Sequence, residues 1–365
     1  MKRNIKIYEN PILYLIILMI GVGTVMMYSA SSTLGVNIHD KYNFYLNRHL
    51  VRLFISIIAF IFIYNINFKI YNNFSKHILI LSWVIMLSAY LLNDSTPTKR
   101  WLIIFGKNIF TTSDFARIAL IIFTASFIEN NKKKINNINF LIRKFIPYFA
   151  VTLLLIFFQP DLSTTFAIAI IITTMLLIAG LEIKKLAIPI ITCICIVGIK
   201  IFNTPFQLKR FTDWFVGNYN MQTENSIQAL GNGGIIGVGI GRSIIKNGFM
   251  PEVHTDFILP IIGEEIGFIG IIFIFILYIA LYFYGVHVCK SAPDIFSSML
   301  SMGITLNIVY YFLINASYVV GLFPTTGLPI PFISYGGSQL LFSCMSIAML
   351  MNISKYINIY KYKSL

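Results

Sequence analysis

Four carboxylates are crowded into one short and mostly apolar stretch of this chain. The stretch GFMPEVHTDFILPIIGEEIG holds Glu252, Asp256, Glu264 and Glu265. The whole chain has only 14 acidic residues among 365, and 57% of it is apolar. A carboxylate can transfer a proton as a general acid or base, and it can pair with cations that bind phosphate. This stretch is therefore the first place to look for chemistry.

Asp256 directly precedes the apolar run FILPIIG, which leaves two roles open for it. Its side chain can cap a helix, because a carboxylate there accepts a backbone N–H and complements the helix dipole. A carboxylate at the end of an apolar helix also lies at the membrane surface, where it can take a proton from a substrate. The two roles are compatible, since a cap fixes the carboxylate in place.

Glu264 and Glu265 lie inside the apolar stretch and need a different explanation. A charged side chain in the middle of a membrane costs roughly 2.5–3.5 kcal/mol on insertion scales, and it usually faces a cavity or a partner. The expected partners are the cations predicted on the same side of the membrane: Arg100, Arg117, Lys209, Arg210 and Arg242. Together these groups predict one cavity that suits an anionic, lipid-linked substrate, with cations for phosphate and a carboxylate for proton transfer.

Three further patterns each leave two interpretations open. Asp114 and Arg117 in SDFAR are three residues apart, which permits an ion pair on one helix face or a role at the site. The Gly-rich run SIQALGNGGIIGVGIGRSII provides either close backbone packing or the floor of a ligand site, because it lacks the βαβ context of a nucleotide-binding loop. The run FPTTGLPIPFISYGGSQ predicts a rigid non-helical hairpin, either a simple helix break or one wall of a cavity.

Composition places these groups in a membrane protein. Charged residues make up 12% of the chain and its mean hydropathy is +0.78, whereas soluble domains carry about 25% charge. We predict a single all-α polytopic membrane domain over 1–365, because apolar runs near the ~20 residues needed to span a bilayer recur along the chain. The ten predicted transmembrane helices cover 11–33, 50–66, 75–93, 113–128, 141–158, 163–181, 186–203, 258–287, 296–322 and 332–354, and a long extracytoplasmic loop, 204–257, joins helices 7 and 8.

The distribution of charge sets the expected topology. The net charge is +14, and 16 of the 28 Lys and Arg residues fall in segments on one side of the predicted spans. Lys and Arg in short loops mark the cytoplasmic side, so both termini are expected there and the long loop outside. The basic charge thus reflects topology and contact with membrane lipid, and no nucleic-acid partner is predicted. The four cysteines lack the spacing of a zinc site, and no metal site is predicted.

Six motifs of this chain resemble, in order and spacing, those of the SEDS family. They are TKRWL, SDFARIAL, FQPDLSTT, GGIIGVGIGRS, MPEVHTDFILPIIGEEIG and FPTTGLPIPFISYGGSQ. This family includes FtsW, RodA and SpoVE, and the similarity covers about residues 10–355. Its members are ten-span peptidoglycan glycosyltransferases that polymerise lipid II outside the bacterial cytoplasmic membrane. GRSIIKNGFMPEVHTDF is more similar to FtsW than to RodA, which implies septal cell-wall synthesis in cell division.

The resemblance implies a mechanism and a set of partners. Asp256 corresponds to the family's catalytic aspartate, the general base for the acceptor sugar hydroxyl, with undecaprenyl pyrophosphate as the leaving group and a β-1,4 linkage as the product. The implied partners are lipid II, a class B penicillin-binding protein and other division proteins, and a divalent cation is the only cofactor left open. The alternatives are an elongation-type polymerase like RodA, a lipid II flippase and a non-catalytic division scaffold. The acids cluster on the outer side, whereas a flippase needs polar groups through the membrane.

Six residues are predicted to bind the substrate beside Asp256: Arg100, Arg117, Lys209, Arg210, His254 and Glu265. Arg100 is a candidate for the pyrophosphate because it forms the Arg-Trp pair that members of the family carry. The sequence departs from the family where members usually read QPSEFAK and this chain reads TTSDFAR. Asp114 and Arg117 therefore replace Glu and Lys, which keeps the charges but changes their reach, and arginine and lysine bind phosphate differently.

Overall fold

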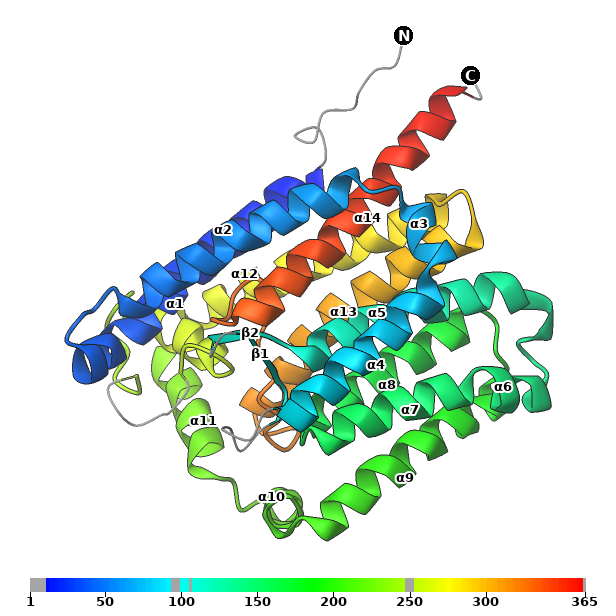
Figure 1. Cartoon of the computed structure of the whole chain (residues 1–365). Helices are drawn as coiled ribbons and strands as arrows, with labels where there is room; N and C mark the ends of the chain where they lie inside the picture. The colour runs from blue at the N-terminus through cyan, green and yellow to red at the C-terminus, as the bar shows by residue number, and fades with distance from the viewer. Residues whose placement is uncertain (1–10, 93–98, 105–106, 247–252, 364–365) are drawn as a thin grey trace. The chain divides into compact units, whose positions relative to one another are not determined.

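A computed structural model of the chain describes residues 11–92, 99–104, 107–246 and 253–363, and Glu252 of the acidic stretch lies outside them. Within these residues a long helix lies in each of the ten predicted apolar segments, although several of the predicted ends differ (Figure 1). These helices are α1 (Pro11–His39), α2 (Phe44–Asn65), α4 (Ser75–Leu92), α5 (Thr112–Asn131), α7 (Ile146–Phe158), α8 (Leu162–Ile178), α9 (Ala187–Asn203), α12 (Ile258–Ser291), α13 (Ile295–Val319) and α14 (Gly337–Lys363). The shorter helices are α3 (Phe68–Asn73), α6 (Ile138–Lys144), α10 (Pro205–Val216) and α11 (Met221–Gly233).

Six of the described helices are long and apolar enough to cross a membrane on their own: α1, α2, α4, α12, α13 and the Gly337–Ile357 part of α14. The bent pair α6 and α7 gives a seventh if its two halves form one span. The helix α8 is apolar but has only 17 residues. The helix α5 carries Asp114, Arg117 and Glu129, and these charges lower its hydropathy although nearly all of its side chains are buried.

The described residues divide into two compact units, and four of the long helices contribute to both. The first unit consists of the described residues of Met1–Ile58, Pro205–Tyr284 and Ile308–Ser343. It therefore holds α1, α10, α11, the first part of α12 and the end of α13. Within it α1 and α2 pack side by side, with the Thr24 hydroxyl 3.4 Å from Nε2 of His49. The segment 320–336, between α13 and α14, is non-helical, as its prolines and glycines predict.

The second unit consists of Ala59–Thr204, Gly285–Asn307 and the described residues of Cys344–Leu365. Polar contacts join its helices at the ends predicted to face outward. The Thr112 hydroxyl on α5 donates to Gln159 at 2.9 Å, and the Gln159 amide donates to the Met86 carbonyl of α4 at 3.0 Å. Asp161 accepts from the Thr164 backbone N–H at 3.2 Å and so caps α8. The tight connection QPDLSTT thus orders the ends of three helices.

One local feature of the second unit departs from an all-helical chain. The predicted outer segment 93–120 contains two short strands, β1 (Trp101–Ile104) and β2 (Lys107–Thr111), which pair antiparallel and lead directly into α5. Arg100, just before β1, accepts the Thr112 backbone N–H at its carbonyl at 3.0 Å. The hairpin therefore ties Arg100 to the start of α5.

Candidate active site

Asp256 lies in the first unit, two residues before α12 begins at Ile258. Its side chain is half-buried and accepts a hydrogen bond from the Thr255 hydroxyl at 2.6 Å. Its backbone carbonyl accepts two more, from the Asn315 amide at 2.8 Å and from the Tyr318 hydroxyl at 2.7 Å. Asn315 and Tyr318 lie on α13 and are fully buried. Two buried side chains of α13 thus hold the backbone of Asp256, while its carboxylate is only half-buried.

Sequence reasoning missed Asn315 and Tyr318. Both lie inside the apolar run of α13, where an isolated asparagine and tyrosine resemble ordinary core residues. The Asn315 amide also donates to the Leu328 carbonyl at 2.7 Å, so one side chain joins the hairpin after α13 to the backbone of Asp256. A buried polar side chain inside an apolar span is expected to satisfy a backbone group, and this is the signal that would have identified Asn315.

Arg210 on α10 is a cation that interacts electrostatically with the Asp256 carboxylate. Burial lowers the pKa of the Arg210 guanidinium, and the negative charge of Asp256 opposes this by raising that pKa. The guanidinium also donates to the Thr325 carbonyl at 2.9 Å. An arginine stays charged under these conditions. The first unit therefore places a positive charge close enough to the carboxylate for the two to interact electrostatically.

A pocket of about 470 Å³ lies next to this arginine in the first unit. Its lining includes Lys209 and Arg210, the polar side chains of Asn218, Asn220 and Thr223, and residues 323–325 of the hairpin. The Asn220 amide donates to the Thr325 hydroxyl at 3.2 Å, which joins α11 to the hairpin. Such a lining offers two cations, one carboxylate (Asp213) and several neutral hydrogen-bonding groups. It can bind an anionic group with attached hydroxyls.

His254 is buried and belongs to an aromatic cluster. Its ring centroid lies 4.6 Å from that of Tyr45 and 5.1 Å from that of Tyr335. Its backbone carbonyl accepts the Tyr335 N–H at 2.9 Å. The guanidinium of Arg52 lies 4.8 Å above the Tyr335 ring. These contacts fix the chain two residues before Asp256, so His254 orders the backbone of the site in addition to any contact with substrate.

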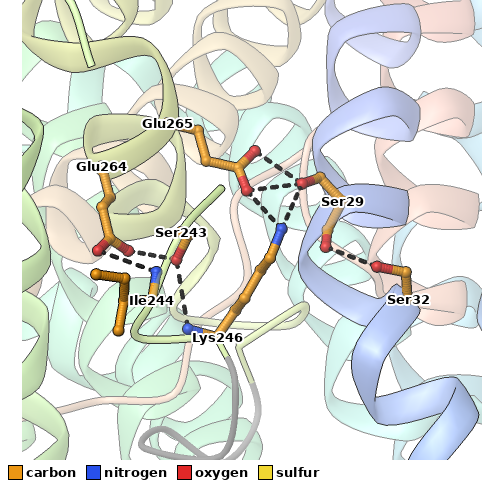
Figure 2. Close-up of polar contacts among 7 residues, drawn as sticks. All are labelled: Ser29, Ser32, Ser243, Ile244, Lys246, Glu264 and Glu265. Carbon is orange, nitrogen blue, oxygen red and sulfur yellow. Dashed lines mark hydrogen bonds and ion pairs between the residues drawn. The ribbon is translucent and has the colours of Figure 1, made fainter. Parts of the chain in front are cut away.

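The partners predicted for Glu264 and Glu265 within the first unit are wrong. Both side chains extend from α12 (Figure 2), and in the described part of this unit neither contacts Lys209, Arg210 or Arg242. Glu264 accepts hydrogen bonds from the Ser243 hydroxyl, from the Ile244 backbone N–H at 3.3 Å and from the Asn232 amide at 3.5 Å. Glu265 forms an ion pair with Lys246 at 2.7 Å and accepts from the Ser29 hydroxyl at 2.7 Å.

Local packing explains the observed partners of the two glutamates. Both glutamates are buried on the first two turns of α12, and the chain that returns toward Asp256 packs directly on them. Ser243, Ile244 and Lys246 on that segment supply the donors that satisfy the two carboxylates. These contacts favour a structural role for Glu265 over the substrate-binding role predicted for it.

The Gly-rich run packs backbone against backbone, which favours the first of its two interpretations. The Val238 N–H donates to the Glu264 carbonyl at 2.9 Å, and the Gly239 N–H donates to the Glu265 carbonyl at 3.0 Å. α12 bends at Gly267, which has φ +79° and ψ −169°. A Cβ on Gly267 would lie 2.4 Å from the backbone nitrogen of Gly237. Only glycine allows both the dihedral angles and the approach.

Arg117 and Arg100 belong to the second unit. Arg117 is fully buried and pairs with Asp114 at 3.0 Å on the first turns of α5, so the ion pair expected from their spacing is present. The Thr111 hydroxyl also donates to Asp114. Arg100 is half-buried, and among the described residues its Nε has no hydrogen-bond partner. Its guanidinium also interacts electrostatically with Asp114.

The described residues contain no group of three or more His, Cys, Asp or Glu side chains that could hold a metal ion. Residues 11–92, 99–104, 107–246 and 253–363 therefore offer no such set of side-chain ligands for the divalent cation that the sequence left open. Substrate phosphates supply oxygen ligands to such ions in many enzymes.

Comparison with known proteins decides the family. The family model for FtsW, RodA and SpoVE, described as "Cell cycle protein", matches residues 10–359. The chain belongs to this family. It is 31% identical to stage V sporulation protein E of Bacillus subtilis over 363 residues, which cover 95% of this chain and 98% of the relative. It is 32% identical to the probable peptidoglycan glycosyltransferase FtsW of Bacillus subtilis over 378 residues, which cover 98% and 93%.

Solved structures share the fold. A chain of a peptidoglycan synthase complex that coordinates polymerisation and crosslinking superimposes with a TM-score of 0.75 at 17% identity, covering 94% of this chain and 97% of that one. The rod shape determining protein RodA of Thermus thermophilus gives a TM-score of 0.68 at 17% identity, with coverages of 94% and 96%. The predicted fold class, an all-α multi-pass membrane protein with ten spans, is confirmed by these matches.

Proposed function

We propose that this FtsW/RodA/SpoVE family member is a peptidoglycan glycosyltransferase that polymerises lipid II at the outer face of the cytoplasmic membrane. One observation carries the proposal: a half-buried carboxylate, Asp256, has its backbone fixed by Asn315 and Tyr318 and has the charge of Arg210 beside it. The names of the FtsW relatives support the same activity.

The chemistry divides between the carboxylate and the cations. Asp256 accepts the proton of the acceptor sugar hydroxyl as that oxygen attacks C1 of the donor sugar. The bond from C1 to the pyrophosphate oxygen breaks, the polyprenyl pyrophosphate leaves, and the configuration at C1 inverts to β. Negative charge grows on the leaving oxygen, so the pocket lined by Lys209 and Arg210 is the proposed place for the pyrophosphate. We also propose that Arg100 and Arg117 bind the lipid II substrate.

The proposed physiological role rests on the names of relatives. Several relatives at about 30% identity are called FtsW, and one is the sporulation protein SpoVE. We therefore propose septal cell-wall synthesis during division, with both termini in the cytoplasm and residues 204–257 outside. The proposed partner is a class B penicillin-binding protein, and the likeness to a chain of a synthase complex that couples polymerisation to crosslinking supports this.

The direct test is polymerisation of purified lipid II by the reconstituted full-length protein with its cognate transpeptidase. Glycan strands longer than the starting disaccharide, separated by gel electrophoresis, are the expected product. The transpeptidase alone serves as the control. Lipid II that crosses the vesicle bilayer without being polymerised would instead assign the protein to the flippases.

The arginine beside Asp256 gives a sharper prediction. Arg210→Gln should lower the rate of polymerisation more than tenfold, a loss of about 1.4 kcal/mol or more of transition-state stabilisation. The neighbouring Lys209 is exposed, so Lys209→Gln should cost less than threefold. The measurement is the initial rate at subsaturating lipid II. Equal rates for wild type and Arg210→Gln would exclude Arg210 from the site.

A further inference from the structure

Lys246 and Glu265 form a buried ion pair that the proposed reaction does not use. The Lys246 ammonium lies 2.7 Å from the Glu265 carboxylate, and their side chains are 4% and 0% exposed. The ammonium also donates to the Ser29 hydroxyl at 3.1 Å, and that hydroxyl in turn donates to Glu265 at 2.7 Å (Figure 2). Three elements, α1, the end of the long loop and α12, thus meet at one closed polar cluster.

The pair brackets the candidate base in the sequence. Lys246 precedes Asp256 by ten residues and Glu265 follows it by nine. Glu265 lies on α12, which begins two residues after Asp256, so the ion pair fixes the start of the helix that adjoins the carboxylate. The chain just before Lys246 has further anchors on α12. The Ser243 hydroxyl donates to Glu264 and accepts the Lys246 backbone N–H at 3.3 Å. Asp256 is held separately through its carbonyl by α13.

Stability alone is a poor explanation for such a pair. Removing two charges from water is costly, and apolar residues of similar size often replace a buried ion pair without loss of stability. What an ion pair adds over apolar packing is a defined geometry, because its hydrogen bonds fix direction as well as distance. The start of α12 adjoins the candidate base, and a base is the residue for which small displacements matter most.

We propose that Lys246 and Glu265 are positioning residues for Asp256, acting with Ser29 to fix the first turns of α12, the helix whose start presents the carboxylate to the acceptor sugar. The proposal rests on the proposed function, since it assigns these residues to the polymerisation step. Neither residue touches substrate. Their loss should therefore lower kcat and leave the KM for lipid II unchanged.

The test uses variants of the full-length protein, reconstituted with its transpeptidase and assayed for kcat and KM with purified lipid II. Lys246→Met combined with Glu265→Gln removes both charges, so no unpaired charge stays buried. We expect kcat at least tenfold below wild type, KM within twofold, and a thermal midpoint close to wild type. Lys246→Arg keeps the charge and the donors, and should retain kcat within threefold.

The matched control is the partly exposed ion pair of Lys185 and Glu182, 2.8 Å apart, whose side chains are 19% and 57% exposed. Lys185→Met combined with Glu182→Gln makes the same chemical change and should leave kcat unaltered. If the buried double variant does not fold, Glu265→Asp gives the readout, because it keeps the charge but shortens the side chain. A loss in kcat of at least threefold with unchanged KM is then expected.

The outcomes separate the two proposals. Wild-type protein that makes no glycan would overturn the proposed function and this role with it. An active wild type, with the folded double variant (or Glu265→Asp) within twofold of its kcat, would overturn the positioning role alone. A raised KM with unchanged kcat would also overturn it, because it would mean that the pair serves substrate binding.

Discussion

Replacing Asp256 with asparagine is expected to abolish glycan polymerisation while the protein still folds. General base catalysis contributes about 10²–10⁴-fold, and an amide cannot accept the proton. The local structure should persist for two reasons. The contacts from Asn315 and Tyr318 go to the backbone carbonyl, and an asparagine oxygen can still accept from the Thr255 hydroxyl.

The measurement is product formed by reconstituted protein, with circular dichroism and gel filtration to establish folding. Asp294→Asn is the matched control, because Asp294 also lies at the start of a helix and accepts the Ser297 backbone N–H at 2.7 Å. An asparagine can replace that cap. Polymer made by the folded Asp256→Asn variant at the wild-type rate would remove Asp256 as the base.

The second large effect is expected on folding. Gly267→Ala places a Cβ 2.4 Å from both the Gly237 nitrogen and the Ile235 carbonyl oxygen, at dihedral angles that are essentially restricted to glycine. The strain alone costs about 1–3 kcal/mol, and the overlap with backbone atoms adds to it. We expect little monodisperse protein in detergent and a clearly lower thermal midpoint.

Gly231→Ala provides the control for this prediction. It lies within α11, and an added Cβ would meet no heavy atom within 4 Å. Alanine is favoured over glycine inside a helix by about 0.8–1 kcal/mol, so this variant should be as stable as wild type or more so. A Gly267→Ala protein with the wild-type thermal midpoint would contradict the close packing of the Gly-rich run on α12.

The helices were predictable because span length and apolarity are local properties of the sequence. The Asp114–Arg117 pair was equally accessible, since three residues on a helix bring two side chains to one face. The partner of Glu265 was not. Lys246 lies 19 residues away in a loop whose path no local pattern defines, and the bridging Ser29 is 236 residues away.

The same limit applies to the candidate site itself. Asp256 stood out because a carboxylate is rare in this chain and directly precedes an apolar run. Asn315 and Tyr318 did not, since their role depends on which backbone carbonyl they reach across the fold. The short strands β1 and β2 were missed as well, because four and five residues next to a turn give too little pattern to separate a strand from a loop.

The attachment of the long loop to α12 limits how the protein can be engineered. Val238 and Gly239 bond to backbone carbonyls of α12, and Lys246 needs both Glu265 and Ser29. A chimera that exchanges residues 204–257 for those of a relative would therefore replace the loop side of these contacts and keep the original α12 and Ser29 side. The transferable module is the loop together with residues 263–268 and position 29, and a graft should be designed with those boundaries.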